Sequence, residues 1–105
     1  MSKAAAGLLR AFLSRALVDK DRILLTEYRS TDWQSLTFVG ERHEMRFRIL
    51  GPDAGKIYEG MTGNLSDTEF AIPRQLVADI AVYGAPTHEC DGSISFGIEA
   101  LTIEE

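Results

Sequence analysis

The clearest pattern along the chain is a helical stripe within its first twenty residues. Six apolar residues recur there at the spacing of one face of a 3.6-residue helix: Leu8, Leu9, Phe12, Leu13, Ala16 and Leu17. Ser2 precedes the stripe and can cap its first turn. The pattern predicts an amphipathic helix over residues 3–18, with Leu13 and Leu17 in the core.

From residue 22 the apolar spacing changes to two, which is the period of a β-strand. Residues 22–29 and 33–39 are predicted as strands, and the polar residues 30–32 as the turn between them. The alternation is cleanest over residues 43–49, which indicates a strand of an antiparallel sheet with one face buried. His43 falls on the apolar face of this strand, so we expect it to be buried at the edge of the core.

Three further strands are predicted over residues 57–61, 76–83 and 94–103. Residues 76–83 also suit a helix, but their β-branched content and the Gly-Ala-Pro that follows favour a strand. In the last segment the apolar parity changes between Ile98 and Leu101. That change predicts either a bulge near residues 99–100 or a strand covered on both faces.

These elements predict a single α+β domain spanning residues 1–105. Its N-terminal helix packs on one mostly antiparallel sheet of about six strands, which is the simplest way to bury both apolar stripes. The alternative is a small curled barrel plugged by the helix. At 105 residues and 45% hydrophobic content, the chain suffices for one packed core and excludes the large catalytic folds.

The net charge of −5 conceals an asymmetry between the two halves of the chain. Residues 1–50 hold nine Lys and Arg against six Asp and Glu, whereas residues 51–105 hold two against ten. A molecule with opposite charge on its two halves can associate with itself or with a partner of matching pattern. The acidic total argues against a dedicated nucleic-acid partner, because such domains are mostly basic.

The numbers of cysteine and histidine residues indicate the cellular compartment of the protein and its ability to bind a metal ion. Cys90 is the only cysteine, so no intrachain disulfide forms, and we expect a cytoplasmic protein. Residues 88–91 (His-Glu-Cys-Asp) are ligand types, but the only other histidine is His43, forty-five residues away. We therefore predict that the protein binds no metal and no cofactor.

The residues singled out for possible chemistry lie close together on the strand over 43–49. They are Arg42, His43, Arg46 and Arg48. His43 could share a proton with a carboxylate, and arginines two apart could hold a phosphate, which defines the alternative of a catalytic or ligand-binding pocket near His43. A further alternative is RNA contact through Arg46 and Arg48.

The leading hypothesis is a protein that is not an enzyme, either a protein-interaction module or a homodimer. Its partner would be a protein, because four aromatic residues exceed what one small core hides: Trp33, Phe38, Tyr58 and Tyr83. The basic N-terminal helix could lie on an anionic membrane. We expect instead that it covers the sheet. We also expect His43 to be buried without a carboxylate partner, with a lowered pKa.

Overall fold

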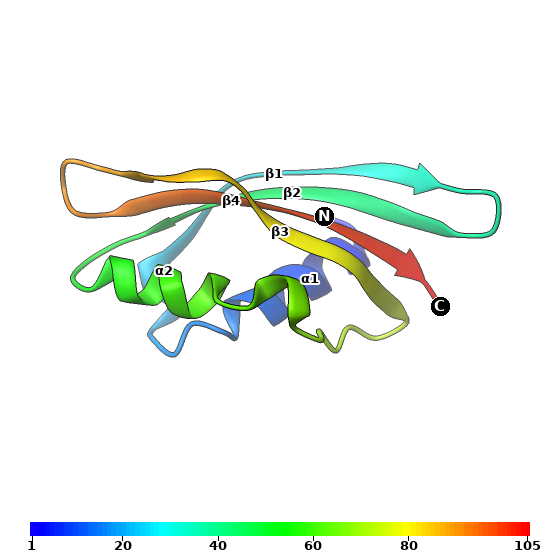
Figure 1. Ribbon diagram of the computed structural model, residues 1–105, viewed down its shortest axis with the longest axis horizontal. Helices are drawn as coiled ribbons and strands as arrows, with labels where there is room; N and C mark the ends of the chain where they lie inside the picture. The colour runs from blue at the N-terminus through cyan, green and yellow to red at the C-terminus, as the bar shows by residue number, and fades with distance from the viewer.

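The computed structural model describes all of residues 1–105 and shows two helices on one face of a four-stranded antiparallel sheet (Figure 1). The strands lie in the order β1-β2-β4-β3, and the sheet is not closed into a barrel. The elements are α1 (Lys3–Leu13), β1 (Ile23–Gln34), β2 (Val39–Ile49), α2 (Ala54–Thr62), β3 (Gln75–His88) and β4 (Ile94–Glu104). Single 3₁₀ turns precede β1 (Lys20–Arg22) and follow α2 (Leu65–Asp67). The α+β class is confirmed.

The chain passes twice through a helix followed by a β-hairpin. The two hairpins meet along β2 and β4, and their tips lie at opposite ends of the longest axis (Figure 1). The molecule measures 46 × 23 × 21 Å, so it is about twice as long as it is wide. Neither helix has the length and apolar content needed to cross a membrane.

The prediction of about six strands is wrong for two reasons, and the first lies in the hairpin of β1 and β2. Residues 30–32 are not a turn, because each pairs with β2, as Thr31 does with Arg42. The turn lies at residues 35–38, where the backbone N–H of Ser35 donates to the carbonyl of Phe38 at 2.9 Å. The strand predicted over 33–39 is therefore the end of β1, the turn and the first residue of β2.

The second reason is that residues 57–61 form part of helix α2 rather than a strand. Ile57 and Met61 are both buried against the sheet, and Glu59 between them is exposed. Residues four apart satisfy the helical period and the strand period equally. Five residues are too few to distinguish the two periods, which explains the wrong assignment.

Helix α1 ends at Leu13, five residues before the predicted boundary. Ser14 caps it, and the next residue, Arg15, turns toward the end of α2, where its Nε donates to the carbonyl of Met61 at 2.7 Å. As a result Leu17 is 95% exposed, so its assignment to the core is wrong. Leu13 is half-buried and packs against the core.

The core lies between the helices and the sheet and is centred on three aromatic rings. The Phe12 ring centroid lies 5.2 Å from Phe47 and 6.2 Å from Phe96, and all three residues are almost completely buried. The four alternating residues of β2 face this core as the pattern predicts, and each is buried: His43, Met45, Phe47 and Ile49.

Strand β4 contains no bulge, which was one of the two alternatives that the parity change predicted. Its ladder with β2 runs without a register shift, and Thr102 occupies the core position that an apolar residue would continue. Leu101 and Ile103 consequently point to the other face, where both are half-buried. The assignment of residues 76–83 to a strand is confirmed, and β3 extends it in both directions. Bulges occur instead in β1 and β3.

Candidate functional site

The sheet face opposite the helices, which we call the open face, carries no covering element (Figure 1). The strand register assigns residues to it, because directly paired residues point to the same side. Its charged residues are Glu27 and Arg29 on β1, Arg42, Glu44, Arg46 and Arg48 on β2, Glu99 on β4 and Asp79 on β3. Of the four residues singled out from the sequence, three arginines lie on this face and His43 lies on the other.

His43 is part of a buried polar network rather than a surface site. It is 1% exposed, with Nδ1 2.8 Å from the hydroxyl of Ser30 and Nε2 2.8 Å from that of Thr102. One ring nitrogen donates and the other accepts, so both are satisfied in the neutral form. The residue does not line any of three surface cavities of about 360, 360 and 600 Å³. This geometry suits a structural role.

Burial lowers the pKa of His43 below its ordinary value of 6.5, and the nearby carboxylate of Glu41 offsets part of that effect. The lowered pKa of His43 agrees with the expectation from the sequence. No carboxylate is hydrogen-bonded to the ring, since both nitrogens bond to hydroxyls.

Stability is expected to depend on pH through His43. Unfolded chains protonate this ring near pH 6.5, whereas the folded protein does so only at lower pH. The free energy of unfolding should therefore be highest above pH 6.5 and fall as the pH drops toward the lowered pKa. Urea titrations on both sides of pH 6.5 measure this slope. His43→Gln retains polar atoms for Ser30 and Thr102, and an unchanged slope in that variant would assign the loss to other groups.

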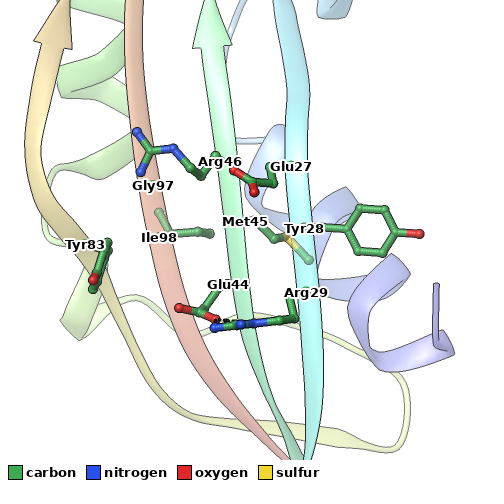
Figure 2. Close-up of a pocket in the computed structure, with 9 residues that line it drawn as sticks. All are labelled: Glu27, Tyr28, Arg29, Glu44, Met45, Arg46, Tyr83, Gly97 and Ile98. Atoms are coloured by element: carbon green, nitrogen blue, oxygen red, sulfur yellow. Dashed lines mark hydrogen bonds and ion pairs between the residues drawn. The ribbon is translucent and has the colours of Figure 1, made fainter.

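Arg46 is the most distinctive residue of the open face. Its side chain crosses β4 at Gly97, where a Cβ atom would lie 2.9 Å from Nη1 of the guanidinium (Figure 2). No carboxylate lies within 4 Å of the Arg46 guanidinium, whereas its neighbour Arg29 is paired with Glu44. Arg46 and Gly97 line a shallow cavity of about 360 Å³ on this face. Tyr83 on β3, which pairs with Gly97 and is 57% exposed, lines the same cavity. Gly97 therefore makes space for a guanidinium that is free to meet a partner.

Arg48 is already engaged within the molecule. Its Nη2 lies 2.8 Å from Asp91 Oδ2, and its Nε donates to the hydroxyl of Ser93 at 2.9 Å. Hydrogen bonds from the hydroxyl and backbone N–H of Ser93, together with Arg48, lower the pKa of Asp91 to about 2. This network holds the turn between β3 and β4, and it occupies the guanidinium.

An apolar row crosses one end of the open face, and the sequence patterns did not reveal it. Trp33 pairs with Gly40, Gly40 with Ile103, and Ile103 with Leu76, so one residue from each strand contributes. Leu76 is 54% exposed, and Leu101 adjoins the row from the next position on the same face of β4. The sequence feature that could have revealed this row is the parity change in β4. It places apolar residues on a second face of the strand instead of marking a bulge.

The exposed aromatic residues lie partly on this face and partly at the hairpin tip. Tyr83 is on the open face, Phe38 is 52% exposed in the turn after β1, and Trp33 is half-buried. Tyr58 does not belong to this surface, because its ring packs edge-on against Phe96 at 5.0 Å in the core. Three of the four aromatic residues therefore remain accessible to a partner.

No family model, no curated protein and no solved structure matches this chain. The structure brings no three His, Cys, Asp or Glu side chains together where they could hold a metal ion. The functional interpretation therefore rests on the open face itself, with its apolar row, its unpaired Arg46 and its mixture of charges.

Proposed function

We propose that this protein is a non-enzymatic protein-interaction module that binds its partner across the open face. One observation carries the proposal: both helices cover the same side of the sheet, and the uncovered side combines an apolar row with charged residues. Protein interfaces have this composition, with apolar and aromatic anchors surrounded by polar groups and enriched in arginine. The single exposed thiol of Cys90 is compatible with the cytoplasmic location that we propose.

The geometry gives less support to the pocket near His43 and to RNA binding. His43 is enclosed by hydroxyl groups within the core, and a general base has to reach the surface of a cleft. Arg48 is engaged by Asp91, and Arg29 by Glu44, so the arginines do not form a continuous basic stripe. Phosphate backbones are bound by clustered, unpaired cations.

Site-specific photo-crosslinking in living cells tests the proposal. A photoreactive residue at Ala81, which is exposed on the open face, should yield an adduct of discrete mass with a protein. The matched control is the same residue at Lys56, which is exposed on α2 on the opposite side of the molecule. Mass spectrometry of the adduct identifies what is bound.

An adduct at Ala81 that is absent at Lys56, and that Leu76→Asp abolishes, supports the open face as the binding surface. Leu76 is half exposed, so aspartate there does not disturb the core. No adduct at Ala81, or equal adducts at Ala81 and Lys56, would contradict the proposal.

A further inference from the structure

We propose, resting on the function proposed above, that the partner is a second copy of this chain. The two copies dock open face to open face about a twofold axis that runs parallel to the strands, above the boundary between β2 and β4. Three features of the open face select this arrangement: its distribution of charge, the position of its apolar row and its area.

The open face is divided into a basic half and an acidic half. The half formed by β1 and β2 carries four arginines and two glutamates, and Asp91 in the turn between β3 and β4 pairs with Arg48, which leaves a balance of +1. The half formed by β4 and β3 carries Glu99 and Asp79, a balance of −2. The strand order β1-β2-β4-β3 keeps these halves side by side instead of interleaving them. The charge asymmetry along the sequence thus becomes an asymmetry across the sheet.

Only one of the two possible twofold axes matches opposite charges. An axis parallel to the strands places β1 over the partner's β3 and β2 over the partner's β4, so each basic half faces an acidic half. An axis perpendicular to the strands, within the plane of the interface, places each basic half on its own copy and juxtaposes like charges. Like-charge juxtaposition costs several kcal/mol in an interface, which excludes the second orientation.

The same axis brings the apolar rows of the two copies together. Rotation about an axis parallel to the strands leaves the position of each residue along the strand direction unchanged. Trp33 therefore faces the partner's Leu76, and Leu76 faces the partner's Trp33. Arg42 comes beside the partner's Asp79, because the two residues belong to one cross-strand row.

The area of the open face is sufficient for a specific dimer. Ten paired residues along β2 and β4, with four strands across, give about 600 Å² per copy at standard β-sheet spacings. Two such faces bury about 1,200 Å² in total, which is at the lower end of specific interfaces.

Sedimentation equilibrium of the purified chain under reducing conditions tests the inference. The wild type should approach twice its mass of 11.6 kDa at concentrations above the micromolar range. Leu76→Asp should return the mass to that of a monomer without loss of the folded circular-dichroism spectrum. Leu17→Asp adds the same charge at a site that is 95% exposed on the helix side, and it should remain a dimer.

A spin label on Cys90 tests the orientation without any substitution, because this only cysteine is exposed in the turn between β3 and β4. An axis parallel to the strands places both labels at the same end of the dimer, within about 30 Å of each other at the usual separation and crossing of packed sheets. The opposite orientation places them at opposite ends, separated by nearly the 46 Å length of the molecule.

Each outcome decides a separate point. A wild-type chain that is monomeric at all concentrations overturns the inference, while an Ala81 adduct with another protein would still support the proposed function. A dimer that Leu76→Asp leaves intact uses another surface and overturns the inference, and the Ala81 adduct then decides separately whether the open face binds a different protein. A dimer with distant Cys90 labels overturns the orientation.

Discussion

Replacing Phe12 by alanine is expected to lower the free energy of unfolding by about 3–5 kcal/mol. Phe12 is the main aromatic contact between helix α1 and the sheet, and its ring lies against Phe47 and Phe96 at 5.2 and 6.2 Å. Truncation removes this buried surface and leaves a cavity under rigid strands. Since native proteins are stable by only about 5–15 kcal/mol, the variant should lose a large share of its stability.

Urea or guanidinium titration measures the effect of Phe12→Ala, with Leu17→Ala as its matched control. Both positions belong to the same apolar stripe of the sequence, but Leu17 is 95% exposed because α1 ends at Leu13. Leu17→Ala should therefore change stability by no more than about 0.5 kcal/mol. Equal losses at the two positions would mean that the helix continues beyond Leu13.

Reversing the charge of Arg42 is expected to weaken self-association about 100-fold or more. The proposed axis brings Arg42 beside the partner's Asp79, and symmetry forms this contact twice. Arg42→Glu replaces two attractions by two repulsions, each costing up to several kcal/mol where water is excluded. Asp79→Arg should weaken the dimer similarly.

The control for this charge reversal is Lys56→Glu. It changes the net charge by the same amount, but Lys56 is exposed on α2, on the helix side of the sheet. The association constant measured by sedimentation should be unchanged in this variant. A similar weakening in Lys56→Glu would show that net charge, rather than a contact on the open face, governs association.

The sequence predicted those elements in which the periodic pattern was long enough to exclude alternatives. The alternation over residues 43–49 placed His43 on the core side correctly, because a slip of one residue would expose every apolar side chain. The prediction of a strand over residues 57–61 failed for the opposite reason, since the pattern of five residues fits a helix and a strand equally well. Turn composition misled at residues 30–32, where pairing with β2 outweighed the local preference of Ser, Thr and Asp for turns.

The open face was predictable in part. The alternation placed Arg46 and Arg48 together on the side away from the core, and the register confirms that they share a face with Arg42. The apolar row was missed because its members come from four strands far apart in the sequence. Strand order alone makes Trp33 and Leu76 members of one row, and no local pattern encodes strand order.

The most direct test of the central claim is to mix Arg42→Glu with Asp79→Arg. Each variant alone should sediment as a monomer, because its own copies repel one another at this contact. In a mixture, the introduced glutamate of one variant would face the introduced arginine of the other, while the native Arg42 and Asp79 form the second contact. The account predicts that the mixture forms a heterodimer of twice the monomer mass. A mixture that stays monomeric at concentrations where the wild type is dimeric would contradict it.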